Sequence, residues 1–192
     1  MRIIAGKFKS RSIEMPKGIK PTSDKVREAL FEILKGRIEG AFFLDLYCGS
    51  GAMGVEAFSR GARSVTFVDK SPGSIGVLKK NLKELGILGL SSIDIYTKDA
   101  VRALETFKAK SMLFDLVFMD PPYYKDLAKN TLIGISNYDI LARNAIIVAE
   151  VYKKEELPLE AGAMKKFRTA RYGDTKLEFY KNEKDSGIPR QL

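Results

Sequence analysis

The chain has 192 residues, a length that predicts one domain with a sizeable buried core. Its 33 Lys and Arg residues exceed its 24 Asp and Glu residues by nine, and this surplus favours a polyanionic partner. The single cysteine, Cys48, and the lack of histidine exclude an internal disulfide, a Cys/His zinc site and a histidine-dependent nucleophile. No apolar stretch is long enough for a membrane span or a signal peptide, so we expect a cytoplasmic protein without a metal.

The first segment of the chain is basic and alternates loosely between apolar and cationic side chains. Residues 1–27 contain eight Lys and Arg residues against two acids, so six of the nine surplus charges lie there. Residues 1–20 are predicted to form a β-hairpin extension, with a bend near Gly6 and basic side chains on its open face. Pro16 and Gly18 end this segment.

The rest of the chain alternates between strand and helix patterns. A helix begins near Ser23, a good N-cap residue, and presents one apolar face. Further helices are predicted at 51–60, 71–86, 100–109 and 125–136, and strands at 41–46, 64–68, 93–96, 115–119, 145–151, 165–171 and 175–181. This order predicts an α/β domain over residues 21–182, with a doubly wound sheet and an antiparallel strand near its end. Residues 183–192 form a polar tail.

A glycine-rich turn follows the first predicted strand. Gly49, Gly51 and Gly54 match the dinucleotide-binding spacing, and Asp69 lies 20 residues after Gly49. An NAD-dependent oxidoreductase is therefore one alternative. Asp45 argues against it, because a carboxylate four residues before the turn would repel a pyrophosphate and would instead pair with an ammonium group.

S-adenosylmethionine (SAM) suits these residues better. Gly49 and Gly51 would let the backbone approach the methionine part of SAM, which a Cβ atom would obstruct. Asp45 would bind its ammonium group, Asp69 the ribose hydroxyls, and Asp99 would lie near the adenine amine. The cofactor-binding residues predicted in this way are Asp45, Gly49, Ser50, Gly51, Asp69 and Asp99.

The stretch Asp120-Pro121-Pro122-Tyr123 follows the apolar strand at 115–119. Two consecutive prolines prevent the strand from continuing, because each lacks an N–H and fixes φ. The Asp120 carboxylate and the Pro121 carbonyl can accept hydrogen bonds from an NH2 group, and Tyr123 can stack on a planar base. The four residues are similar to the catalytic motif of methyltransferases that act on the exocyclic nitrogen of a nucleobase, and we predict that they are catalytic.

The whole chain resembles the RsmD-type 16S rRNA guanine-N2 methyltransferases. The resemblance rests on stretches that occur in order at residues 2–7, 20–31, 44–57, 59–62, 120–123 and 172–175. It implies a Rossmann-like, seven-stranded, mostly parallel SAM-dependent methyltransferase fold that acts on the exocyclic N2 of a guanine in small-subunit rRNA. It also implies that Thr22 touches the methionine end of SAM. The expected partner is the rRNA or an assembling small-subunit particle, and we expect a monomer.

Two other functions remain open from the sequence. One is an adenine-N6 methyltransferase on RNA or DNA, and the other is an rRNA-binding assembly factor that retains SAM without turnover.

For the basic surface, the predicted RNA-binding residues are Lys7, Lys9, Arg11, Arg27 and Arg171.

Overall fold

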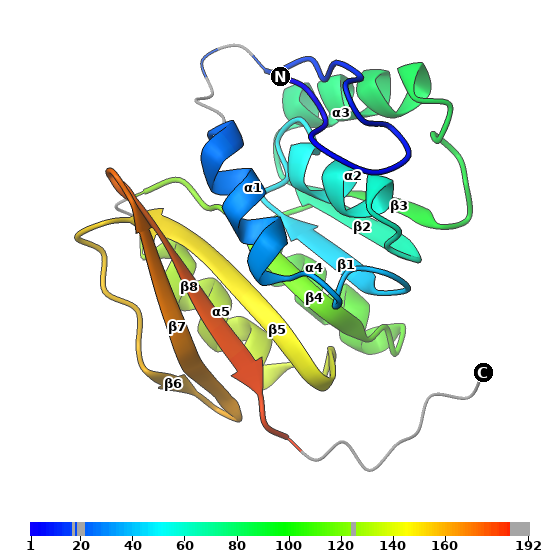
Figure 1. Ribbon diagram of the computed structural model, residues 1–192. Helices are drawn as coiled ribbons and strands as arrows, with labels where there is room; N and C mark the ends of the chain where they lie inside the picture. The colour runs from blue at the N-terminus through cyan, green and yellow to red at the C-terminus, as the bar shows by residue number, and fades with distance from the viewer. Residues whose placement is uncertain (17, 19–21, 124–125, 185–192) are drawn as a thin grey trace.

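A computed structural model describes residues 1–16, 18, 22–123 and 126–184. Its middle layer is an eight-stranded sheet with the order β3-β2-β1-β4-β5-β8-β7-β6 (Figure 1). The parallel strands are β1 (Phe42–Leu46), β2 (Ser64–Asp69), β3 (Ile93–Thr97), β4 (Phe114–Met119) and β5 (Leu141–Tyr152). The antiparallel part consists of β6 (Glu160–Ala161), β7 (Met164–Tyr172) and β8 (Thr175–Asn182).

The predicted fold class is confirmed, with one difference in strand number. Seven of the strands match predicted segments, and the eighth is β6, a two-residue strand that pairs with β7 through Ala161 and Met164. Two residues give too short a pattern to stand out from a turn in the sequence.

Within the described residues, five helices cover the two faces of the sheet. Helices α1 (Asp24–Ile33), α2 (Ala52–Ser59) and α3 (Pro72–Glu84) pack on one face, and α4 (Ala100–Ala109) and α5 (Leu127–Asn137) on the other (Figure 1). Each layer of helices closes its own apolar core against the sheet. Within the described ranges, no helix has the length and apolar character needed to cross a bilayer.

Helix α1 shows how the sequence pattern produces this packing. The Ser23 hydroxyl accepts a hydrogen bond from the Val26 N–H at 3.3 Å, which satisfies one of the free donors at the helix start. Val26, Leu30 and Phe31 then recur on one face and are at most 5% exposed. Their apolar area holds α1 against the sheet.

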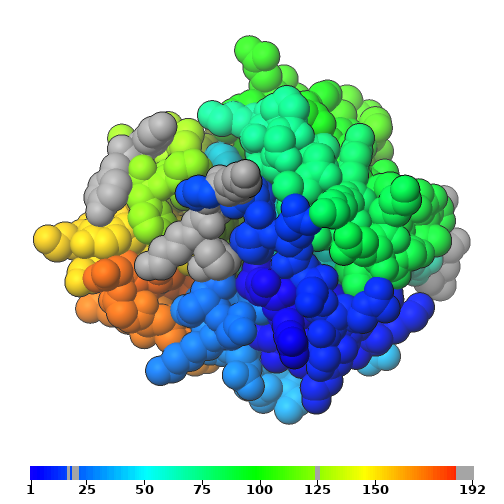
Figure 2. Space-filling view, turned by 90° about the horizontal axis from the view of Figure 1, so that it is seen from above, coloured from blue at the N-terminus to red at the C-terminus, as the bar shows by residue number. Residues whose placement is uncertain are grey.

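The basic N-terminal segment forms a loop closed by one antiparallel bridge, between Arg2 and Ser12, instead of the two paired strands that were predicted. Its apolar side chains Ile3, Phe8 and Ile13 are buried in the same core as α1, α2 and α3. The segment therefore packs as part of the domain. Figure 2 shows it, in dark blue, beside the green surface of α3, where the Glu14 N–H donates to Asn81.

Gly6 is the position that lets this loop lie so close to α2. Its φ of 80° is left-handed, and a Cβ atom there would lie 1.8 Å from the Ser59 carbonyl oxygen. The Lys7 N–H donates to that carbonyl at 2.7 Å, and the Phe8 N–H donates to the Ser59 hydroxyl at 2.9 Å. The end of α2 thus anchors the basic loop through backbone contacts.

Candidate active site

Three carboxylates meet at the carboxyl edge of the sheet, where β1, β4 and β5 end. Asp45 lies on β1, Asp120 directly follows β4, and Glu150 lies on β5. The last paired residues of β4 and β5 are Met119 and Ala149, so Asp120 and Glu150 are the next neighbours across the two strands. The residues two positions before the three acids all belong to the core under α1 and α2: Phe43, Phe118 and Val148. The three acids therefore share that face of the sheet.

Asp45 is buried, with 1% of its surface exposed, and its Oδ2 accepts a hydrogen bond from the Gly54 N–H at 2.8 Å. The pKa of Asp45 is raised to about 7: burial is the largest cause, the Gly54 hydrogen bond opposes it, and the nearby Asp69 carboxylate adds to the rise. A cation bound beside Asp45 would favour its charged form. This supports the predicted contact to an ammonium group.

Asp120 and Glu150 are also held in surroundings that disfavour negative charge. Burial and the nearby carboxylates of Glu150 and Asp45 raise the pKa of Asp120 well above its usual range. Burial likewise raises the pKa of Glu150, although the Thr22 hydroxyl donates a hydrogen bond to its Oε2 at 2.8 Å. Glu150 was not among the site residues predicted from the sequence. The sequence does contain an indication of it: Glu150 is the one charged residue in the otherwise apolar stretch at 145–151.

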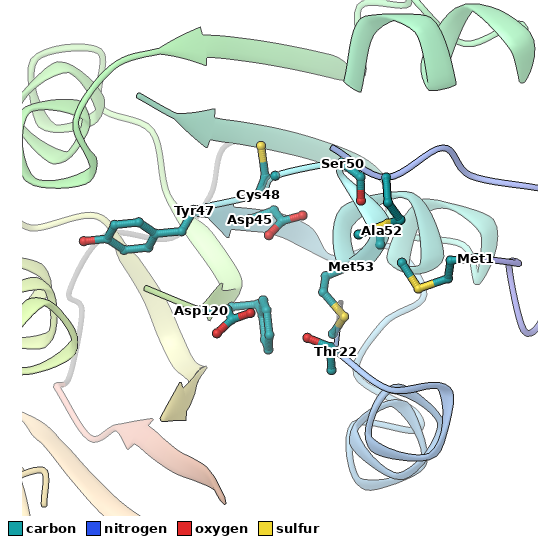
Figure 3. Close-up of a pocket in the computed structure, with 12 residues that line it drawn as sticks. Met1, Thr22, Asp45, Tyr47, Cys48, Ser50, Ala52, Met53 and Asp120 are labelled. Atoms are coloured by element: carbon teal, nitrogen blue, oxygen red, sulfur yellow. The ribbon is translucent and has the colours of Figure 1, made fainter. Parts of the chain in front are cut away.

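A cavity opens between Asp45, Asp120 and the glycine-rich turn (Figure 3). It is lined by predicted site residues from three parts of the chain, namely Thr22, Asp45, Gly49, Ser50 and Asp120. No Lys or Arg lines the cavity among the described residues. Carboxylates without a basic partner fit a positively charged ligand, and SAM has both an ammonium group and a sulfonium.

The glycines of the turn have different roles, and the prediction that Gly51 makes room for the ligand is wrong. A Cβ atom on Gly49 would meet nothing within 4 Å, and the Gly49 N–H donates to Asp69 Oδ2 at 2.9 Å. A Cβ atom on Gly51 would lie 2.3 Å from Leu78 Cδ1, on the core side of the turn. Gly51 is thus required for packing, and Gly49 is the glycine beside the cavity.

Gly54→Ala is expected to lower the melting temperature, because the new methyl group would lie 2.3 Å from Phe67 Cε1 and 2.7 Å from Val65 Cγ1. Such overpacking typically costs about 1–3 kcal/mol. Gly76→Ala in α3 is the matched control: it meets no atom within 4 Å and should stabilise the helix by about 0.5–1 kcal/mol. Thermal unfolding of both variants checks the pair, and an unchanged melting temperature for Gly54→Ala would contradict the packing role.

Asp69 and Asp99 lie at the predicted strand ends but do not line the cavity. Asp69 holds the loops that follow β1 and β2, because its two oxygens accept hydrogen bonds from Gly49 and Ser71 N–H groups at 2.9 and 2.8 Å. Asp99 caps α4 through a hydrogen bond from the Val101 N–H at 3.0 Å. The observed contacts of both acids are structural, and their contacts to ribose and adenine stay predictions.

Tyr123 is the last residue of the stretch that was predicted to be catalytic. Its hydroxyl lies 3.3 Å from Thr175 Oγ1, at the start of β8, and its ring lies 5.9 Å from the Tyr152 ring. The ring is half-buried, with Pro122 exposed beside it. The turn between β7 and β8 thus helps to position Tyr123, which no local pattern indicated.

Cys48 lies in the glycine-rich turn and is 8% exposed. Burial, followed by the nearby carboxylates of Asp45 and Asp69, raises the pKa of its thiol well above the usual range. A protonated thiol is a poor nucleophile, so Cys48 serves packing.

The predicted RNA-binding residues divide into two groups. Lys7, Lys9, Arg11 and Arg171 are exposed. Arg27 is fully buried at 0% exposure, so the prediction that it contacts RNA phosphates is wrong. Its periodic position on α1 faces inward, where it forms ion pairs with Asp24 at 2.8 Å and Glu56 at 3.8 Å.

Fold and site together define a SAM-dependent methyltransferase. The doubly wound sheet, its antiparallel end and the acid-lined cavity at the carboxyl edge fit this class, and the predicted cofactor, S-adenosylmethionine, fits the charge of that cavity. Among solved structures, the Escherichia coli protein yhhF superposes with a TM-score of 0.82 at 30% identity, covering 95% of this chain and 98% of that one. A more distant one, SMU.776 complexed with SAH, has a TM-score of 0.68 at 18% identity, covers 91% of this chain and 52% of that one, and shows the fold alone.

The chain belongs to the RsmD family. Residues 1–181 match the family model described as "Conserved hypothetical protein 95". The protein YlbH of Bacillus subtilis strain 168 is 37% identical over 183 residues, covering 94% of this chain and 98% of YlbH. The ribosomal RNA small subunit methyltransferase D of Escherichia coli K12 is 34% identical over 134 residues, covering 69% of this chain and 65% of that protein. The family and the class predicted from the sequence are therefore confirmed.

Proposed function

We propose that this protein transfers a methyl group from SAM to the exocyclic N2 of a guanine in 16S rRNA, in the cytoplasm. Membership of a family whose relatives include small-subunit rRNA methyltransferases supports rRNA methylation. The observation that carries the chemistry is the position of Asp120, which directly follows β4 and lines the cavity beside Asp45. This position supports a role for Asp120 as the acceptor of an amine proton next to the proposed site of a cationic methyl donor.

The chain's own residues would act on the amine in three ways. Bound SAM supplies a methyl group on a positively charged sulfur. Asp120 and the Pro121 carbonyl accept the two N–H bonds of the amine, which aims the nitrogen lone pair at the methyl carbon. Asp120 also stabilises the positive charge that develops on nitrogen. Tyr123 stacks on the extruded base, a contact worth about 1–3 kcal/mol.

The deciding experiment is transfer of labelled methyl from SAM to unmethylated small-subunit particles, followed by nucleoside analysis of the product. We expect N2-methylguanosine. N6-methyladenosine would keep the roles of Asp120 and Tyr123 but replace guanine with adenine as the target. Tight SAM binding without transfer to particles, naked rRNA or DNA would favour the non-catalytic assembly factor.

The exposed cations of the N-terminal loop are proposed to contact rRNA phosphates. Replacing Lys7, Lys9 and Arg11 together with glutamine should weaken RNA binding and reduce the slope of log affinity against log salt by about 2, because each lost phosphate contact contributes roughly 0.7. Substitution is preferable to deletion, since Ile3, Phe8 and Ile13 belong to the core. A filter-binding or anisotropy titration at several salt concentrations measures the slope.

The control for this test carries the same loss of charge on the other face of the sheet. Lys108 and Lys110 lie at the end of α4, Lys129 lies on α5, and all three are exposed. Replacing them with glutamine should leave the slope within about 0.5 of the wild type. Equal slopes for both triple variants would show that net charge, and not the N-terminal loop, drives RNA binding.

A further inference from the structure

Glu150 is a buried acid at the active site for which the mechanism above gives no role. It is 4% exposed and lies on β5, one position beyond the last paired residues of β4 and β5. Its neighbour across the two strands is Asp120. Its Oε2 accepts a hydrogen bond from the Thr22 hydroxyl at 2.8 Å, which fixes the side chain on the cavity face of the sheet.

Nothing in the fold requires an acid at this position. The residue opposite Glu150 on β8 is Leu177, which is fully buried, and the preceding inward residue is Val148. Burying a carboxylate in such surroundings costs several kcal/mol unless a cation compensates it. Among the described residues, no Lys or Arg forms an ion pair with Glu150 or Asp120.

The charged groups around the pair are acidic or engaged elsewhere. Asp45 faces Asp120 from β1, and the Tyr123 phenol lies near both acids. Arg27, the buried cation of α1, is paired with Glu56 and Asp24. Lys166 and Lys176 of the antiparallel hairpin both form ion pairs with Glu178. Glu178 follows Leu177 on β8, so its side chain points to the face of the sheet opposite to Leu177 and Glu150. Among the described residues, the carboxylate of Glu150, which lies beside Asp120, therefore has no cation to balance its charge.

We propose that Glu150 is a positioning residue for methyl transfer, which acts through Asp120 by strengthening that carboxylate as the acceptor of the amine proton. The inference rests on the proposed N2 methylation. An isolated aspartate is a weak base, and an acceptor works best when its proton affinity is matched to the working pH. A second carboxylate alongside raises that affinity, as in other carboxylate pairs. The raised pKa values of both groups agree with this arrangement.

The N2 lone pair forms the new N–C bond while the C–S bond breaks and leaves its electron pair on sulfur. The nitrogen thereby gains a positive charge, and it loses one N–H proton to Asp120. Glu150, which is kept in place by Thr22, shares this proton with Asp120. The proton passes to solvent when the product leaves. No oxidant, reductant or further reactant is needed.

The first test is the pH dependence of turnover in Glu150→Gln, which keeps the size and a hydrogen-bond acceptor for Thr22. Removing the negative charge lowers the pKa of Asp120, so the acid limb of the kcat profile should move to lower pH by about one unit. Because Asp120 is then a weaker base, the plateau kcat should fall by about tenfold, part of the roughly 10²–10⁴-fold that a positioned base contributes. Glu150→Asp, which keeps the charge, should retain the position of the limb.

The matched control is Glu178→Gln, a buried glutamate of the neighbouring strand on the opposite face of the sheet. It should lower the melting temperature because it leaves Lys166 and Lys176 with fewer partners, but the acid limb should stay in place. A purely structural Glu150 would behave in the same way. An unmoved limb in Glu150→Gln would therefore overturn the proposal.

A second test needs no RNA and is independent of the base that is methylated. Binding of cationic SAM favours the ionised acids and should release protons near neutral pH, which calorimetry in buffers of different ionisation heat counts. Glu150→Gln should release fewer protons than the wild type, and equal release would contradict a shared proton. Failure to form N2-methylguanosine would instead refute the proposed function. The comparison of proton release between Glu150→Gln and the wild type would still show whether Glu150 and Asp120 share a proton.

Discussion

Asp120→Ala is expected to reduce methyl transfer by about 10³-fold or more while SAM affinity stays within about tenfold. The loss is large because one side chain serves as proton acceptor and as stabiliser of the charge on nitrogen, and each role contributes roughly 10²–10⁴-fold. Affinity changes little because Asp45 still lines the cavity, and because removing one of three crowded acids lowers the pKa of the other two.

Single-turnover transfer of labelled methyl and calorimetric SAM titration measure the two quantities for Asp120→Ala. Asp94→Ala is the matched control, since Asp94 is an exposed acid on β3 away from the cavity lining, and it should leave both quantities unchanged. Turnover of Asp120→Ala within tenfold of the wild type would mean that Asp120 and its prolines only end a strand.

The order of helices and strands could be predicted because each element carries a strong periodic pattern and a clear stop signal. The helix at 100–109 matches its predicted bounds, and the Ser23 cap and the strand at 64–69 agree to within one residue. The edge strand β6 could not be predicted because two residues give too short a pattern, and the single bridge of the N-terminal loop could not because the loop depends on contacts with a distant segment. In that loop, anchoring to Ser59 of α2 replaces strand pairing.

The site was predictable where its chemistry is local and obscure where it depends on neighbouring strands. Asp45 and Asp120 lie at strand ends next to glycine or proline signals, and the structure brings both to one cavity. Gly51 looked like Gly49 in the sequence, yet its missing Cβ faces Leu78 across the core. Glu150 became meaningful only through the register of β4 and β5, which places it beside Asp120.

Arg27→Met is expected to destabilise the protein by about 1–3 kcal/mol, because it leaves the Arg2 carbonyl without its donor and removes one of the two cations of Glu56, which keeps its ion pair with Arg60 at 2.7 Å. Glu56 is fully buried and accepts hydrogen bonds from the Ile4 and Ala5 N–H groups at 2.8 and 3.0 Å. Arg27 donates to the Arg2 carbonyl at 2.7 Å. The pair therefore joins α1 and α2 to the basic loop, and chemical denaturation of the variant measures its contribution.

A double-mutant cycle separates this network from a role in RNA binding. Among the described residues, Nε and Nη1 of Arg27 have no hydrogen-bond partner, so the buried cation is itself poorly satisfied. The combined loss of stability in Arg27→Met with Glu56→Gln should be smaller than the sum of the two single losses, since the Arg27–Glu56 ion pair that both changes remove can be lost only once. Lys25→Met, an exposed change on the same helix, should cost less than about 0.5 kcal/mol. If Arg27→Met instead left stability intact and lowered the salt dependence of RNA binding, the buried network would be the wrong account of Arg27.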